Sequence, residues 1–320
     1  MPRRKPEGQL IDGVAADPHL DPDLFREALK FRAKRGDIVQ LSYPKSGTHW
    51  VIYIMQLILK RGEPVRSYEE FVADMRYLGI VDFKRWAPNL PVRIFQTHQV
   101  PQKETMTEEG KYVYLARNPW DVCVSLFHMT TNLLGYRFEE GTFDDFFESF
   151  IEGDCGVTGS YFNHVALGYA LRNEPNVFFI TYEELLADTR GTVLRLARFL
   201  GENYARELEQ DVGLLEKLLE RCTADSMRPV LVMDLSGRSS QEEWDDAMHR
   251  VDISCKEGDT GDNKKYCPIR EGKVGGWKKY FSTEQLWRLE AKIREEEKNS
   301  AFMDLWKGVR EEALAASMKD

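Results

Sequence analysis

Residues 42–50 read Ser-Tyr-Pro-Lys-Ser-Gly-Thr-His-Trp, and this stretch decides the fold of the chain. The preceding residues 37–41, Asp-Ile-Val-Gln-Leu, are typical of a strand, and the almost wholly apolar residues 50–60 are typical of a buried helix. A strand, a tight loop and a helix together bind anions, because the loop amides and the first helical turn point at one site and Lys45 adds a positive charge. We therefore predict a phosphate-binding loop, although the lysine precedes the single glycine and a Walker A motif is absent.

Strand-like and helix-like segments alternate after this loop. The predicted strands cover 92–97, 111–116 and 176–182, and the predicted helices cover 120–129, 142–151, 160–173 and 183–199. This alternation predicts an α/β fold in which a central, mostly parallel sheet is covered by helices on both faces. Ligands of such sheets bind at the carboxyl ends of the strands, so the Lys45 loop, His98 and Arg117 are expected to meet at one edge.

The composition excludes several classes of protein. With 320 residues, one large domain or two small domains would fit, and 42% hydrophobic residues exclude disorder for most of the chain. The net charge of −9 argues against a general nucleic-acid binder, although a nucleotide site needs only a local positive cluster. We expect a single domain over residues 1–320.

The compartment is predicted from the N-terminus, the apolar runs and the cysteines. Residues 1–8 are polar and no apolar signal core follows them, while the longest apolar run, 50–59, is half of the ~20 residues that span a membrane. The five cysteines include no Cys-x-x-Cys pair, which is typical of free thiols in a reducing compartment. We expect a cytoplasmic protein with no membrane contact and no metal site.

Three segments have their own character. Residues 1–30 form an N-terminal segment before the first predicted strand, and residues 239–267 form a polar loop that is either a lid or partly disordered. Residues 283–299 form a charged amphipathic helix, with Leu286, Leu289 and Ile293 at helical spacing.

Four motifs, in order between Asp37 and Phe281, resemble those of the cytosolic sulfotransferases, and the overall pattern is most similar to invertebrate, arthropod-like members. They are Tyr43–Trp50, Gln96–His98 with Pro101 after it, Arg117–Val122 followed by Ser125, and Arg270–Lys278. The family's sulfonate donor is 3′-phosphoadenosine 5′-phosphosulfate (PAPS), which leaves as 3′-phosphoadenosine 5′-phosphate (PAP). The resemblance therefore implies a PAPS-dependent sulfotransferase.

The resemblance implies catalytic roles for His98, Lys45 and Ser125. A histidine after a strand is often only structural, but the matching histidine of the family takes the proton from the acceptor hydroxyl. An imidazole with an ordinary pKa of ~6.5 suits that role. Lys45 is implied to stabilise charge on the oxygen that bridges sulfur and phosphorus.

The implied donor-binding residues surround the phosphosulfate, the 3′-phosphate and the base. They are Lys45, Ser46, Gly47, Thr48, His49, Trp50, Arg117, Ser125, Tyr182, Thr223, Arg270 and Gly272. Arginine suits phosphate because its planar fork can bond two oxygens at once. Trp50 is the expected stacking platform for adenine.

Five positions depart from the family pattern. His49, Gln96, Asp225, Glu271 and Gly276 stand where threonine, lysine, phenylalanine, lysine and aspartate are usual. Because Gln96 carries no charge, we expect either a slower chemical step or a compensating cation elsewhere. His49 either contacts phosphate or lines the acceptor entrance, and Asp225 cannot supply the second ring that stacks on adenine in the family.

The expected acceptor is a hydroxyl, or less often an amine, of a small molecule such as a phenol, catecholamine or steroid. Candidates for an apolar acceptor pocket are Phe83, Trp86, Phe127, Tyr161, Phe162 and Tyr169. The segment through which the family dimerises has lost its usual residues at 278–287, so we expect a monomer or weak homodimer. The alternatives are a non-catalytic nucleotide-binding family member and a small-molecule kinase with a variant phosphate loop.

Overall fold

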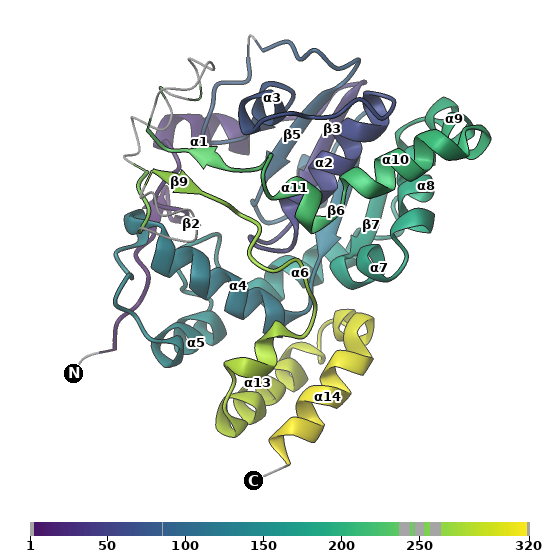
Figure 1. Cartoon of the computed structure of the whole chain (residues 1–320). Coiled ribbons are helices and arrows are strands. Elements are labelled where there is room, and N and C mark those ends of the chain that lie inside the picture. The colour runs from purple at the N-terminus through teal and green to yellow at the C-terminus, as the bar shows by residue number, and fades with distance from the viewer. Residues whose placement is uncertain are drawn as a thin grey trace.

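The computed structural model describes residues 3–84, 86–236, 244, 246, 253–256 and 264–318. Its centre is a five-stranded, entirely parallel sheet with the strand order β4-β5-β3-β6-β7 (Figure 1). The strands are β3 (Asp37–Leu41), β4 (Arg76–Tyr77), β5 (Arg93–Thr97), β6 (Lys111–Ala116) and β7 (Val177–Thr181). The four predicted strands and the parallel α/β architecture are confirmed, and the two-residue edge strand β4 is an addition.

The side chains of the central strands alternate between two hydrophobic clusters, one on each face of the sheet. In β6, Val113 and Leu115 belong to one cluster, whereas Tyr112 and Tyr114 belong to the other. This alternation follows from the two-residue period of a strand. Both faces are therefore apolar, and both need a layer of helices.

Helices cover both faces, and those of each layer bury side chains in the matching cluster (Figure 1). The first cluster includes α2 (Thr48–Leu59), α3 (Tyr68–Ala73), α8 (Thr189–Leu200), α9 (Glu202–Gln210) and α10 (Val212–Arg221). The second includes α4 (Pro119–Asn132), α5 (Phe143–Glu152), α6 (Tyr161–Ala170), α13 (Thr283–Glu296) and α14 (Lys307–Ser317). The remaining helices of the described residues are α1 (Pro22–Leu29), α7 (Tyr182–Ala187) and α11 (Ala224–Met227), with short 3₁₀ turns at Lys103–Thr105, Leu134–Tyr136, Gly276–Lys279 and Phe302–Trp306.

One predicted helix is wrong. Residues 183–199 form two helices, α7 and α8, because the side chain of Asp188 accepts a hydrogen bond from the amide of Gly191 at 2.8 Å and caps the second helix. Tyr182, which we expected at the end of a strand, is the first residue of α7. The amphipathic helix expected at 283–299 is present as α13, with Leu286, Leu289 and Ile293 buried.

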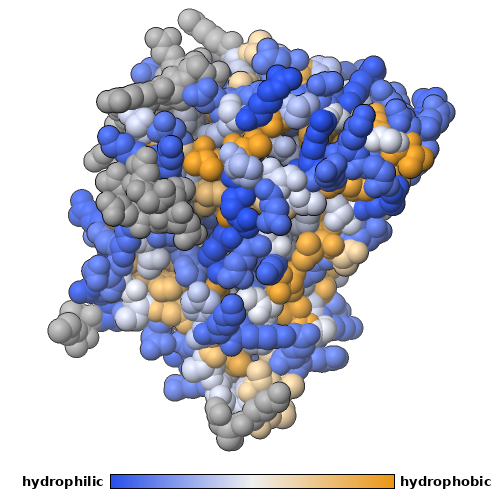
Figure 2. Space-filling model, in the orientation of Figure 1, coloured by the Kyte–Doolittle hydropathy of each residue, from blue (hydrophilic) through white to orange (hydrophobic). Residues whose placement is uncertain are grey.

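Two small antiparallel pairs lie outside the main sheet. β1 (Gln9–Ile11) pairs with β2 (Val14–Ala16), and β8 (Met233–Asp234) pairs with β9 (Lys265–Tyr266). Most of the predicted polar loop 239–267 lies outside the described residues, so its role as a lid stays a prediction. In the orientation of Figure 1 the surface is mostly hydrophilic, with small apolar groups between the polar side chains (Figure 2). None of the described helices is long and apolar enough to cross a bilayer.

Candidate active site

A cavity of about 470 Å³ lies among the loops that follow β3, β5 and β6. The sequence-predicted residues that line it are Lys45, Gly47, Thr48, His49, Trp50, His98, Arg117, Ser125, Tyr182, Thr223, Arg270 and Gly272. The structure thus brings residues from four separate motifs to one cavity, as the parallel topology predicts. Ser46 is fully buried beside them, does not line the cavity, and its Oγ has no hydrogen-bond partner among the described residues.

The loop between β3 and α2 has the backbone of an anion site. Gly47, with φ of 108°, caps α2, and no side chain caps the first amides of this helix. A Cβ on Gly47 would lie 2.7 Å from the ring of Tyr182, so only glycine fits between the loop and α7. Lys45 adopts a φ of 69°, and such left-handed conformations in residues other than glycine are concentrated at functional sites.

The ammonium of Lys45 is held at the inner end of this loop. Its Nζ donates to the carbonyl of Pro268 at 3.3 Å and to the hydroxyl of Tyr266 at 3.4 Å. Burial and the nearby charge of Arg117 lower the pKa of Lys45 to about 8. An anion bound beside Lys45 would favour the charged ammonium and so raise its pKa toward the ordinary value.

Arg117 joins the two loops that carry the predicted phosphate contacts. Its guanidinium donates to the carbonyl of Lys45 at 3.3 Å and to the carbonyl of Lys273 at 2.8 Å, and it lies 4.3 Å from the ring centre of Tyr182. Its Nε is buried and has no partner among the described residues. Ser125 lies two turns along α4 and lines the same cavity, as the spacing predicted.

The glycine-rich stretch after β9 lies across the cavity from the Lys45 loop. Gly272 has a φ of 68°, and a Cβ there would lie 2.6 Å from the Cβ of Ala224. Glu271 lines the cavity, and its carboxylate binds the guanidinium of Arg270 at 2.5 Å. Glu271, which stands where the family usually has lysine, therefore occupies part of the Arg270 guanidinium that the sequence analysis assigned to phosphate.

Asp121 is a supporting residue that the sequence analysis missed. Its buried carboxylate accepts the amides of Gly275 at 2.9 Å and Trp277 at 3.2 Å, and Asn118 donates to it at 3.0 Å. These bonds fix the end of the glycine-rich stretch against α4. The cue in the sequence was the acidic residue inside the Arg-Asn-Pro-Trp-Asp motif.

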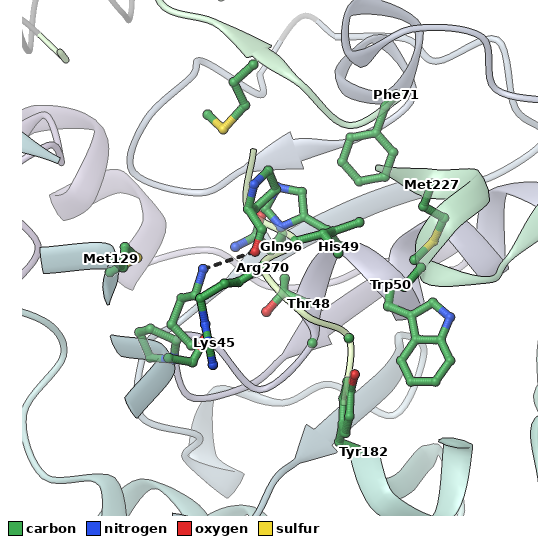
Figure 3. Close-up of a pocket in the computed structure, with 18 of the residues that line it drawn as sticks. Lys45, Thr48, His49, Trp50, Phe71, Gln96, Met129, Tyr182, Met227 and Arg270 are labelled. Carbon is green, nitrogen blue, oxygen red and sulfur yellow. Dashed lines mark hydrogen bonds between the residues drawn. The ribbon is translucent and has the colours of Figure 1, made fainter. Parts of the chain in front are cut away.

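The predicted base-stacking residues form the outer wall. The indole of Trp50 donates to the carbonyl of Cys222 at 2.8 Å and meets the ring of Tyr182 edge-on at 5.0 Å. Thr223 lines this wall, while Asp225 is exposed and forms an ion pair with Arg228. The buried Met227 also lines the cavity, and Figure 3 shows it above the indole of Trp50, opposite Met129.

His98 is fixed by a hydrogen bond on each side of its ring. Its Nδ1 lies 2.7 Å from the carbonyl of Ser42, and its Nε2 lies 3.1 Å from the amide nitrogen of Gln96. Because a carbonyl can only accept, Nδ1 carries the proton and Nε2 presents a lone pair. Burial lowers the pKa of His98 to about 4, below the ordinary value assumed from the sequence, so the imidazole is neutral at physiological pH.

His49 belongs to the apolar part of the cavity. Its ring stacks on Phe71 at 5.6 Å and on Tyr68 at 6.2 Å, as seen beside Phe71 in Figure 3. Burial and the charge of Lys45 lower the pKa of His49 to about 3. Of the two positions left open by the sequence, these contacts favour the acceptor side over the phosphate.

The six aromatic residues proposed for the acceptor pocket were wrong, because none of them lines the cavity. Phe83 and Trp86 pack on Phe95, Tyr169 packs on Phe179, and Phe127, Tyr161 and Phe162 belong to the cluster under α4, α5 and α6. The apolar wall is built instead by Tyr68, Phe71, Met75, Ile80, Met129, Leu133 and Trp244. Trp244 comes from the segment predicted as a lid.

Three comparisons with known proteins agree with this geometry. Residues 35–301 match the family model described as a sulfotransferase domain. The chain is 35% identical over 182 residues to sulfotransferase 2B1 of Mus musculus, a match that covers 53% of this chain and about half, 52%, of that relative. It is 26% identical over 293 residues to amine sulfotransferase of Oryctolagus cuniculus, which covers 90% of this chain and 89% of the relative.

A solved structure has the same fold. A mouse sulfotransferase complexed with PAP superposes with a TM-score of 0.64 at 23% identity, and the match covers 96% of this chain and 99% of that one. The family model spans most of the chain, including the Lys45 loop, His98, Arg117 and the glycine-rich stretch. The chain therefore belongs to the sulfotransferase family.

Proposed function

We propose that the protein transfers a sulfonate group from PAPS to a hydroxyl of a small organic acceptor, such as a phenol, catecholamine or steroid. The observation that carries this proposal is the sharing of one cavity by an anion-binding loop and a neutral, oriented imidazole. An amine acceptor is the less favoured variant of the same reaction.

The donor site fits the chemistry of PAPS. The first amides of α2, which no side chain caps, and the buried Nε atoms of Arg117 and Arg270 are donors without acceptors among the described residues. Such groups are costly to bury unless an anion completes them. The amides of Gly47 and Thr48 would hold the 5′-phosphosulfate, Arg117, Ser125, Arg270 and the Gly272 amide the 3′-phosphate, and Trp50, Tyr182 and Thr223 the base.

When bound, PAPS supplies the activated sulfonate, whose bond to the phosphate oxygen breaks as a bond to the acceptor oxygen forms. Nε2 of His98, which lines the cavity, takes the proton of the acceptor hydroxyl once that hydroxyl replaces the side-chain amide of Gln96, which donates to Nε2 at 3.1 Å. Lys45 stabilises the negative charge that collects on the phosphate oxygen. Lys45 must be protonated to stabilise this charge, and the negative charge of bound PAPS favours the protonated ammonium.

Acceptor binding depends on the apolar wall. Tyr68, Phe71, Met75 and Ile80 line the cavity on one side of His49, and none of them carries a charge. Burial of a ring against such a wall contributes about 25 cal/mol per Å² of apolar surface. A small ring or ring system with a single hydroxyl near His98 fits this wall, whereas an anionic sugar polymer does not.

The test is to follow labelled sulfonate from PAPS onto a panel of phenols, catecholamines, steroids and simple alcohols, with PAP binding measured on the same protein. Transfer to one class supports the proposal and identifies the acceptor. Tight binding of PAP without transfer to any member of the panel would refute it and favour a non-catalytic nucleotide-binding protein. The ion pair between Glu271 and Arg270 would then be the first feature to test as the cause of the lost transfer.

A further inference from the structure

The N-terminal segment contributes a carboxylate to the cavity wall. Asp17 lines the cavity and its side chain is 20% exposed. Oδ1 accepts the backbone amide of His19 at 2.9 Å and lies 2.7 Å from Nδ1 of the same residue, and Oδ2 accepts the hydroxyl of Tyr136. A carboxylate has about four acceptor positions, so these three bonds leave one of them for a further donor.

Asp17 is held in place by contacts on both sides. The side-chain amide of Gln9 donates to the carbonyls of Asp17 and Leu20, both at 2.8 Å. The ring of His19 is buried against Gly135, where a Cβ would lie 2.2 Å from its Nε2. The carboxylate is therefore part of a built wall rather than of a free tail.

Nε2 of His19 has no hydrogen-bond partner among the described residues. Nδ1 of the same ring, 2.7 Å from Oδ1 of Asp17, donates to the carboxylate, because an ionised carboxylate can only accept. Burial raises the pKa of Asp17, but the neighbouring His19 and the bonds from His19 and Tyr136 outweigh it and hold the pKa below its usual value.

The Asp17 carboxylate lies on the same side of the cavity as His98. Asp17, Tyr77 and His98 share the wall of a second, smaller cavity of about 20 Å³, and the ring of Tyr77 meets that of His98 edge-on at 5.5 Å. The negative charge of Asp17 also acts to raise the pKa of His98, although burial prevails. Asp17 thus belongs to the acceptor end.

The charges along the described wall of the main cavity are divided between its two ends. Lys45, Arg117, Arg270 and Lys273 accompany the loops proposed to bind the donor, and Arg190 of α8 pairs with Glu216. The carboxylates are Glu271, which binds Arg270, and Asp17, whose partner is His19 and to which the described residues supply no lysine or arginine. At the acceptor end, His49 and His98 are neutral because burial lowers the pKa of each.

We propose that Asp17 is a specificity-determining residue that binds a protonated amine of the acceptor whose hydroxyl is sulfonated. The inference rests on the proposed function and names the acceptor class within it: aminoalkyl phenols and related hydroxy amines. A carboxylate with little solvent and apolar neighbours is completed by a cationic N–H donor, which forms a charge-assisted hydrogen bond. The same charge repels acceptors that carry a carboxylate.

The test compares tyramine with 4-propylphenol, which has a methyl group in place of the ammonium, and with 3-(4-hydroxyphenyl)propionate, which carries a negative charge. Both binding to the protein–PAP complex, by calorimetry, and kcat/KM for sulfonate transfer are measured. We expect tyramine to bind about tenfold more tightly than 4-propylphenol and to show a similar advantage in kcat/KM. The propionate should bind more weakly than either.

Asp17→Asn keeps the size of the side chain and an oxygen that can accept from Tyr136, while it removes the charge. We expect this variant to lose the tyramine advantage and to keep binding of 4-propylphenol within about threefold, because the apolar wall is unchanged. Asp12→Asn is the matched control: Asp12 lies on the same segment, pairs with Arg26 and is exposed, so its loss should leave the preference intact.

Equal binding of tyramine and 4-propylphenol to the wild-type complex would overturn the inference without any variant. An equal loss of both ligands in Asp17→Asn would also overturn it, since that result indicates a structural role. The binding measurement separates this inference from the proposed function. If tyramine is preferred in binding but no acceptor is sulfonated, the amine site stands and the proposed catalysis fails.

Discussion

Nε2 of His98 accepts a hydrogen bond of 3.1 Å from the side-chain amide of Gln96, while its Nδ1 is held 2.7 Å from the carbonyl of Ser42. Gln96 therefore occupies the lone pair that an acceptor hydroxyl must reach if His98 is the base, as proposed. Its amide orients the imidazole, but it supplies no charge to a transferring sulfonate. The pair keeps the imidazole of His98 oriented although Gln96 stands where the family usually has lysine.

Replacing Gln96 with lysine should speed the chemical step. An ammonium at this position adds positive charge where the sulfonate passes, and we expect kcat to rise about tenfold while PAP binding changes little. Single-turnover measurement of labelled sulfonate transfer checks this. A kcat equal to or below the wild-type value would mean that another cation already compensates for Gln96.

The acid limb of the pH–rate profile should lie well below neutrality. Because burial lowers the pKa of His98 to about 4, the imidazole is already neutral at pH 5 and above. We expect kcat/KM to stay nearly constant from about pH 7 down to about pH 5. A fall centred near an ordinary histidine pKa of ~6.5 would contradict this environment for the base.

PAP binding should weaken as the pH rises through about 8, the pKa to which burial and Arg117 lower Lys45. The sign follows because the free protein loses the ammonium proton above this value, whereas the complex favours the charged form. Calorimetric titrations between about pH 7 and 9.5 should show affinity falling by up to tenfold per pH unit.

Lys45→Met should bind PAP more weakly and without this dependence on pH. Lys84→Met is the control, because Lys84 pairs with Glu27 on the surface and does not line the cavity. An unchanged pH dependence in Lys45→Met would assign the titration to another group.

Gly272→Ala should weaken PAP binding by more than Gly159→Ala does. Both glycines have positive φ, 68° and 80°, so both substitutions strain the backbone by about 1 kcal/mol. A Cβ at Gly272 also meets Ala224 at 2.6 Å, whereas nothing lies within 4 Å at Gly159. Thermal unfolding and PAP titration of the two variants separate strain from displacement of the loop; equal PAP affinities would refute the role of Gly272.

The sequence predicts the sheet well because its strands are buried on both faces and therefore appear as short apolar runs. The edge strand β4 has only two residues, which is too short for any period to show. The break between α7 and α8 was missed because apolar spacing continues through Asp188, and the cap that separates the helices depends on one side-chain hydrogen bond.

The gathering of the proposed donor-binding residues in one cavity was predictable, because several of them follow strands whose carboxyl ends must meet in a parallel sheet. The acceptor side was not. Asp17 reaches Tyr136 across 119 positions, and nothing in the spacing of the N-terminal segment indicates this contact. The aromatic candidates failed for a related reason: the three core clusters also contain aromatic residues, and periodicity does not tell which ring faces a cavity.

The most direct test of the account measures transfer of labelled sulfonate from PAPS to a phenol by the wild-type protein and by His98→Ala, with PAP binding measured for both. His128→Ala is the matched control, since His128 also makes a ring-nitrogen hydrogen bond of 2.7 Å, to the hydroxyl of Tyr280, but does not line the cavity. The account predicts that His98→Ala loses about 10²–10⁴-fold in kcat, with PAP affinity nearly unchanged, and that His128→Ala retains transfer. Near-normal turnover by His98→Ala would contradict it.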